Sequence, residues 1–211
     1  MPIDFKKEQK DLYQPKSTPS IIDVPEMTFI AVDGKGDPNT SDEYAAAIEI
    51  LYGLSYSIKM GNKTILEYVV PPLEGFLTVD GKYESCEIID KDKFHWTALI
   101  RQPVFVTAEI FEFAKITLAK KKPNLDTSKA QFIKINEGLC VQAMHIGSYD
   151  DEPATIAAME QYATEQGYVV DINDICQPGS GRRHHEIYLS DPRKVAPEKL
   201  KTVIRHPIKK Q

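Results

Sequence analysis

Two stretches of this chain repeat the same order of elements, and this duplication restricts the possible fold more than any other sequence feature. In residues 27–103 a strand pattern is followed by a helix pattern and two further strand patterns. Residues 131–192 repeat this β-α-β-β order, although residue identity between the copies is weak. Two such units predict an α+β domain: one antiparallel sheet, helices on one face and a central ligand cleft between the copies.

Local signals mark the elements of the first copy. Residues 27–32 have a strand pattern, and Thr40-Ser41-Asp42-Glu43 has the form of a capping box that opens a helix ending near Gly61. Strand patterns follow at 66–79, interrupted by two prolines, and at 94–101. A further helix is expected between about Thr107 and the lysines at 120–122.

The second copy is expected to open with a hairpin of residues 131–135 and 139–146. Asp151-Glu152-Pro153 then begins a helix that ends near Gly167, and strand patterns follow at 168–170 and 185–189. We expect the Lys/Arg-rich tail from Arg193 to lie on the surface. Residues 1–20 are expected to form a polar arm that precedes a ligand-binding domain over residues 21–211.

Charge and cysteine content narrow the classes of protein. The 26 basic and 31 acidic residues give a net charge of −5, which disfavours a protein that reads duplex DNA by neutralising phosphates. The 3 cysteines form no C-x-x-C pair, so no zinc ribbon or disulfide framework is expected. The sequence shows no signal peptide and no apolar run near the ~20 residues of a membrane helix. We therefore expect a cytoplasmic protein with neither direct nucleic-acid binding nor a membrane segment.

The strand pattern at 185–189 carries the main candidate chemistry. Alternation places Glu186 and Tyr188 on one side and Ile187 and Leu189 on the other. If the aliphatic residues face the helices, the acid and the phenol face the cleft. There they could bind a cationic aromatic ligand, activate a water or donate a proton. The alternative is that both lie on a solvated sheet face.

Aromatic residues elsewhere supply candidate walls for a ligand site, namely Trp96, Tyr68, Phe76, Tyr56 and Phe111. The alternative, that they are ordinary core residues, is stronger for Phe111 than for Tyr68 and Trp96. No metal site and no cofactor are expected. The adjacent residues His184 and His185 would point to opposite faces of a strand, and they cannot chelate one ion there.

Several segments resemble the GyrI-like small-molecule-binding family, whose domain is also attached to multidrug-responsive transcription regulators. The resemblance is most specific in His184-His185-Glu186-Ile187-Tyr188 and in the run from Glu137 to Pro153. It covers nearly the whole chain beyond residue 20, through residues 29–38, 70–75, 96–103, 137–153 and 184–194. The chain is similar to the stand-alone branch, since no helix-turn-helix segment precedes the domain.

This resemblance implies two β-α-β-β units around a ligand cleft. It also implies that a glutamate on the final strand, here Glu186, faces aromatic and often cationic molecules. Some stand-alone members hydrolyse the cyclopropane ring of DNA-alkylating natural products. The chain departs from many relatives at Phe76-Leu77, where a tryptophan is expected.

Three roles follow from these features. The preferred one is binding of small aromatic, cationic or electrophilic xenobiotics in the cleft. The second is a detoxifying hydrolase in which Glu186 activates water and Tyr188 donates a proton to the leaving carbonyl. The third, inhibition of a partner protein by contact, has no marked surface. The first two use the same acid and aromatics, so the sequence separates them poorly, and it does not indicate an oligomeric state.

Overall fold

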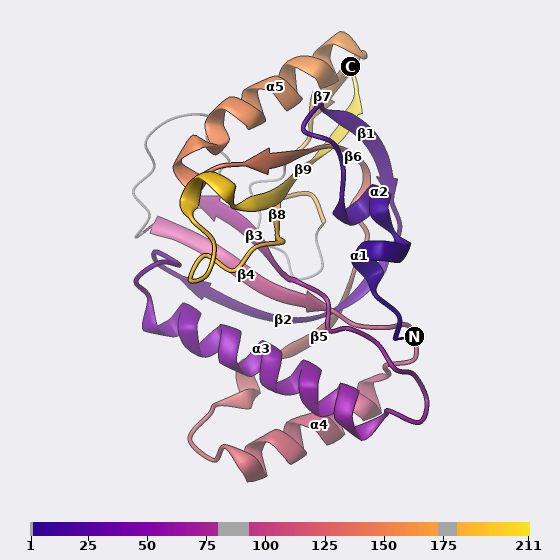
Figure 1. The fold of residues 1–211 in the computed structure, drawn as a ribbon, viewed down its shortest axis with the longest axis vertical. Coiled ribbons are helices and arrows are strands. Elements are labelled where there is room, and N and C mark those ends of the chain that lie inside the picture. The colour runs from indigo at the N-terminus through magenta and orange to yellow at the C-terminus, as the bar shows by residue number, and fades with distance from the viewer. Residues whose placement is uncertain (1, 80–92, 173–180) are drawn as a thin grey trace.

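A single antiparallel sheet forms the centre of the computed structural model, which describes residues 2–79, 93–172 and 181–211 (Figure 1). Its strands, in chain order, are β1 (Ser20–Val24), β2 (Met27–Lys35), β3 (Leu73–Val79), β4 (Phe94–Arg101), β5 (Gln131–Ile135), β6 (Gly138–Ile146), β7 (Tyr168–Val170), β8 (His184–Tyr188) and β9 (Lys201–Lys210). Their order across the sheet is β1-β6-β9-β8-β3-β4-β2-β5, and β7 pairs with β9. The expected α+β fold with an antiparallel sheet is confirmed.

The strand order is symmetric about the central pair, β3 and β8. One half contains β2, β3 and β4, and the other contains β6, β8 and β9, which extends past residue 192 to residue 210. The strand that precedes β2 in the chain, β1, completes the second half, and the strand that precedes β6, β5, completes the first. Residues of β1 pair with β6, and residues of β5 pair with β2. The expected hairpin of residues 131–146 is therefore wrong, because the short turn between β5 and β6 sends the two strands to different partners.

Two long helices lie on the same face of the sheet. They are α3 (Asp42–Gly61) and α5 (Glu152–Glu165), and a third helix, α4 (Ala108–Lys121), packs on the outer side of α3 (Figure 1). The side chain of Ser41 caps α3 by accepting a hydrogen bond from the Tyr44 amide. Short helices are α1 (Phe5–Glu8), α2 (Lys10–Tyr13) and 3-10 turns at Thr127–Lys129, Tyr149–Asp151 and Pro197–Lys199.

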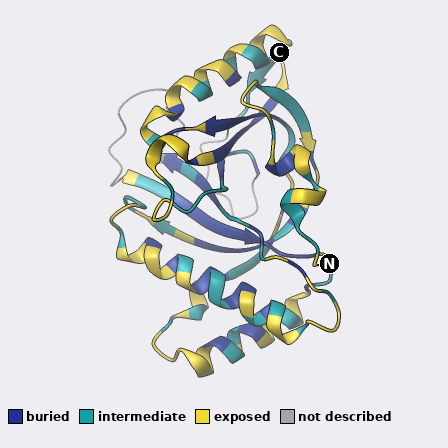
Figure 2. Cartoon of the chain, viewed as in Figure 1, coloured by how far each residue is buried: buried dark blue, intermediate teal, exposed yellow. Residues whose placement is uncertain are grey.

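Both faces of the sheet are packed, so its central strands are largely buried while the helices expose their outer sides (Figure 2). On the helix face, α3 covers one cluster that includes Trp96, and α5 covers another around Met159. On the opposite face, Leu12 and Tyr13 of α2 join a third cluster with Phe76. Within residues 2–20, α2 is thus tied to the core. None of the helices in the described part of the chain has the length and apolarity that crossing a membrane requires.

The tail expected on the surface is a central strand. Most of β9 is buried, from Thr202 to Ile208, and it pairs with both β6 and β8. Lysines at both ends of β9 give the segment a polar composition. Successive residues of β9 point to opposite faces of the sheet, and both faces are buried. Val203 and Arg205 face one side, and Ile204 and His206 face the other.

Buried charges connect β9 to the rest of the opposite face. Arg205 is fully buried and donates to Glu137 at 3.0 Å. Glu137 accepts from His185 at 2.9 Å, and the other ring nitrogen of His185 lies 3.1 Å from Glu74. Tyr13 donates to Glu74 at 3.4 Å. The network therefore joins three strands, a turn and the N-terminal segment.

This network predicts a pH-dependent free energy of unfolding. Burial lowers the pKa of His185, but Glu137 and Glu74 outweigh it and raise the pKa above 6.5. Burial raises the pKa of Glu137, but His185 and Arg205 outweigh it and lower the pKa to about 2. The His185 contribution is complete below pH 6.5 and is lost as the pH rises through its folded pKa. The Glu137 contribution is complete above pH 4.5 and is lost as the pH falls towards 2.

Urea unfolding between pH 3 and pH 9, spaced by about one pH unit, tests this expectation. The His185→Gln variant should lose the decline in stability on the alkaline side. An unchanged alkaline decline in this variant would assign the pH dependence to other groups.

Candidate functional site

A cluster of polar side chains lies on the helix face of the central strands. His184, Glu186 and Tyr188 alternate along β8 and share this face. Glu186 lies opposite Gly75 of β3 and Ile204 of β9, and Ile204 packs in the cluster under α5. The expected orientation is therefore reversed: Glu186 faces the side of the helices, between α3 and α5, and Ile187 packs on the other side.

Glu186 is held by a chain of hydrogen bonds. Its Oε1 lies 2.8 Å from His184 Nε2, and His184 Nδ1 lies 2.7 Å from His206 Nε2. All three residues are buried, and Glu186 keeps only 6% of its surface exposed. Tyr188 donates to Glu186, and Glu152, in the first turn of α5, shares a hydrogen bond with it, which requires a proton on one of the two carboxyl groups. This arrangement fixes the carboxylate in one position.

Electrostatics keep Glu186 ionised despite its burial. Burial alone raises the pKa of Glu186, but the hydrogen bond and charge of His184 outweigh it and lower the pKa below its usual value. Burial and then the charge of Glu186 raise the pKa of Tyr188 well above 10.0. The same causes raise the pKa of Tyr149 to about 12. The site thus combines a buried anion with phenols that keep their protons.

Three of these residues lie close enough together to hold one metal ion. Glu152, His184 and Glu186 each offer one ligand atom, and these atoms lie within 4.8 Å of one another. The expectation of no metal rested on the adjacent pair His184 and His185 and on the lack of a second ligand pair at zinc spacing. It missed the combination of alternate residues on β8 with the start of α5. The donor set, two carboxylates and one imidazole, suits divalent transition metals.

Aromatic rings extend from the carboxylate towards α3. The phenol of Tyr44 hydrogen-bonds Tyr188, and its ring packs edge-on against Trp96 with centroids 4.9 Å apart. Tyr149 packs edge-on against Tyr188 at 5.9 Å. Trp96 is therefore linked to Glu186 through two tyrosines.

The other aromatic residues expected at the site do not gather there. Phe76 points to the opposite face, where it packs on His185 with centroids 4.3 Å apart. Tyr56 is 51% exposed on α3, and Tyr68 is buried against Phe105. Phe111 stacks on Phe132 within the core under α3 and α4. The expected aromatic box is corrected to a smaller group around Tyr188, because strand alternation and helix packing separate these rings.

Sequence reasoning missed five members of the cluster, namely His184, His206, Tyr44, Tyr149 and Glu152. One signal was present for His184, since residues 184, 186 and 188 share one face of a strand. Alternation within 201–210 would have placed His206. No local pattern indicates that Tyr149 and Glu152 approach β8, because their position depends on how α5 packs.

Gly75 provides a way to disturb the site without changing its charge. A Cβ at Gly75 would lie 2.9 Å from the Tyr188 hydroxyl. We expect Gly75→Ala to displace this hydroxyl and raise the pKa of Glu186, because a hydrogen bond that lowers that pKa is lost. A ¹³C NMR titration of the carboxyl measures the change. Gly61→Ala is the matched control, since a Cβ at Gly61 meets nothing within 4 Å. An unchanged pKa in Gly75→Ala would contradict the expectation.

Known proteins share this fold over nearly the whole chain. A family model, the GyrI-like small molecule binding domain, matches residues 17–209. An uncharacterized conserved protein from Listeria innocua is 46% identical with a TM-score of 0.90, over 98% of this chain and 100% of that chain. A structure described as a hydrolase from Listeria innocua is 45% identical with a TM-score of 0.87, over 98% and 100%.

More distant similarity concerns the fold alone. The C-terminal domain of EcmrR is 13% identical with a TM-score of 0.53, over 92% of this chain and 98% of that domain. No curated protein matches the chain.

Proposed function

Because the chain belongs to the GyrI-like small molecule binding domain family, we propose that it binds small aromatic, cationic or electrophilic molecules at the Glu186 cluster. The ligand would lie between α3 and α5, against β8. Within a cell, this binding would sequester foreign compounds.

The observation that carries this proposal is the buried, ionised carboxylate of Glu186 among phenol rings. An anion in a site of low dielectric attracts a cation more strongly than one in water does. Tyr188 hydrogen-bonds the carboxylate, Tyr44 and Tyr149 contact Tyr188, and these rings can add cation–π contacts. An aromatic cation therefore satisfies both the charge and the rings.

An isosteric pair of probes tests this preference for a cation. Benzyltrimethylammonium and neopentylbenzene have the same shape but differ in charge. Trp96, the only tryptophan of the chain, packs on Tyr44 and reports binding by fluorescence. We expect the cation to bind at least about tenfold more tightly, as a charge-assisted contact provides. Equal affinities would contradict the role of Glu186 as a counter-ion.

Hydrolysis of strained electrophiles is a second candidate function. Two observations favour it: the 45% identity to a structure described as a hydrolase, and the hydrogen bonds that orient Glu186 through His184. In this reaction Glu186 accepts a proton from water, and the water oxygen bonds to the cyclopropane methylene. The ring carbon–carbon bond breaks, and its electron pair moves to the conjugated carbonyl oxygen. That oxygen takes a proton from Tyr188, and the protonated Glu186 then gives its proton to the Tyr188 oxygen.

Mass spectrometry with a cyclopropane-bearing duocarmycin-type compound separates the two functions. A product that has gained one water, beyond the uncatalysed rate, would establish hydrolysis. Unchanged compound that quenches Trp96 fluorescence would leave binding alone. If neither signal appears and the two isosteric probes bind with equal affinity, both functions are contradicted.

A further inference from the structure

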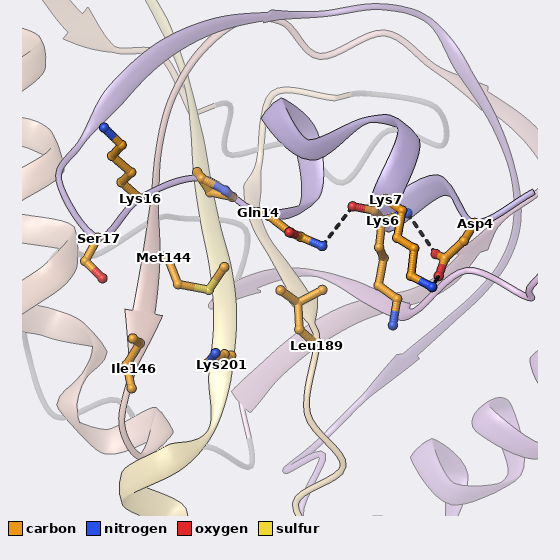
Figure 3. A pocket seen from close by; sticks show the side chains of 11 residues that line it. Asp4, Lys6, Lys7, Gln14, Lys16, Ser17, Met144, Ile146, Leu189 and Lys201 are labelled. Atoms are coloured by element: carbon orange, nitrogen blue, oxygen red, sulfur yellow. Dashed lines mark hydrogen bonds and ion pairs between the residues drawn. The ribbon is translucent and has the colours of Figure 1, made fainter.

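A groove lies on the sheet face opposite Glu186, between the sheet and the N-terminal segment (Figure 3). Its volume is about 660 Å³, within the range of small-molecule sites. Met144, Ile146 and Leu189 provide an apolar floor, and residues 4, 6, 7 and 14–17 provide the walls. Met144 and Ile146 share one face of β6, which points away from α5. The groove is therefore separate from the Glu186 cluster.

The rim of this groove is strongly basic. It carries Lys6, Lys7, Lys16 and Lys201, whereas the chain as a whole has a net charge of −5. The one acidic residue of the lining, Asp4, already accepts from the Lys6 amide and lies 3.6 Å from the Lys7 ammonium. Most of the positive charge on the rim is thus left for an anion.

Backbone and side-chain hydrogen bonds hold this rim in place. The Met144 amide donates to the Lys16 carbonyl at 2.9 Å, which ties the wall to β6. The side chain of Gln14 donates to the Lys6 carbonyl at 2.9 Å, which joins the two walls (Figure 3). Lys201 lies directly opposite Ile146 in the paired strands. The lysines therefore start from fixed backbone positions around the floor.

The apolar floor restricts the class of anion. Ile146 is 53% exposed, although it lies in a strand of the central sheet. A fully hydrated inorganic anion would leave this surface uncovered, whereas an apolar chain would bury it. We propose that the groove binds a small amphipathic anion, with its apolar body on Met144, Ile146 and Leu189 and its carboxylate, sulfate or phosphate head among the lysines.

Titration of the full chain with monomeric decanoate tests this proposal, read out by ¹³C-labelled methionine methyl groups. The Met144 signal should shift, and the signal of Met159, buried under α5, should not. Decanol and decylammonium have the same apolar chain without the negative head, and we expect neither to bind comparably. Decyl sulfate and decyl phosphate, titrated in the same way, identify the preferred head group. Added salt should weaken binding of the anions.

Paired lysine variants locate the site. We expect Lys16→Gln with Lys201→Gln to weaken decanoate binding about tenfold. The matched control, Lys63→Gln with Lys120→Gln, removes the same charge from exposed positions at α3 and α4 and should leave binding unchanged. Equal binding of decanol, equal weakening by the two double variants, or a shift of Met159 without Met144 would each overturn the proposal.

Discussion

Glu186→Gln is expected to weaken binding of benzyltrimethylammonium by about tenfold to a hundredfold, since it removes the charge of a buried counter-ion while keeping its shape. Binding of neopentylbenzene should stay the same. If the protein is a hydrolase, the rate of water addition should fall by about 10²–10⁴-fold, because the general base is lost. Fluorescence of Trp96 gives the affinities, and mass spectrometry gives the rate.

The control for this variant is Glu198→Gln, which makes the same charge change at an exposed position in the turn Pro197–Lys199. It should alter neither affinity nor rate. If Glu186→Gln also leaves both unchanged, the Glu186 cluster is not the ligand site. A protein that acts only through contacts with a partner would give that result.

Arg205→Met is expected to lower the free energy of unfolding by about 3–5 kcal/mol, the range found when one partner of a buried ion pair is removed. Arg205 donates to Glu137, to Gln142 and to the Leu12 carbonyl at 2.8 Å. Methionine fills similar space but leaves all three acceptors without this donor. Urea unfolding at pH 6 (about the middle of the stable range) measures the loss.

Two further variants keep this prediction testable. Arg205→Lys retains the charge with fewer donors, and its loss should be intermediate, so it serves where Arg205→Met does not fold. Arg193→Met removes an exposed arginine that pairs with Asp191, and we expect little change. A loss in Arg205→Met no larger than that in Arg193→Met would contradict a stabilising role for the network.

Local patterns were sufficient for the class of fold and for the family. Helical spacing after Ser41 and alternation in 27–32 and 94–101 depend on neighbouring residues, and the α+β fold and the GyrI-like resemblance built on them are confirmed. Strand partners depend on contacts between distant residues. The hairpin of residues 131–146 was therefore wrong, and so was the surface position expected for residues 202–208 of the tail.

In the candidate site too, local patterns were predictable and contacts between distant residues were not. Alternation correctly put Glu186 and Tyr188 on one face of a strand, and the same rule applies to His184. The strand pattern could not indicate which face of β8 the helices cover, because both faces are buried. The approach of Tyr44 and Glu152 arises from the packing of α3 and α5, and no spacing along the chain encodes it.

The exchange of β1 and β5 between the two copies affects how a ligand can reach Glu186. If the two halves of the sheet separated to admit a ligand, the β3–β8 pair at its centre is where they would do so. Parting them as rigid bodies would leave the β1–β6 and β5–β2 ladders intact, because each ladder lies within one half. It would instead pull on the two short connections that cross between the halves, from β1 to β2 and from β5 to β6. We therefore expect a ligand to reach Glu186 through side-chain movements at α3 and α5 rather than through separation of the two halves.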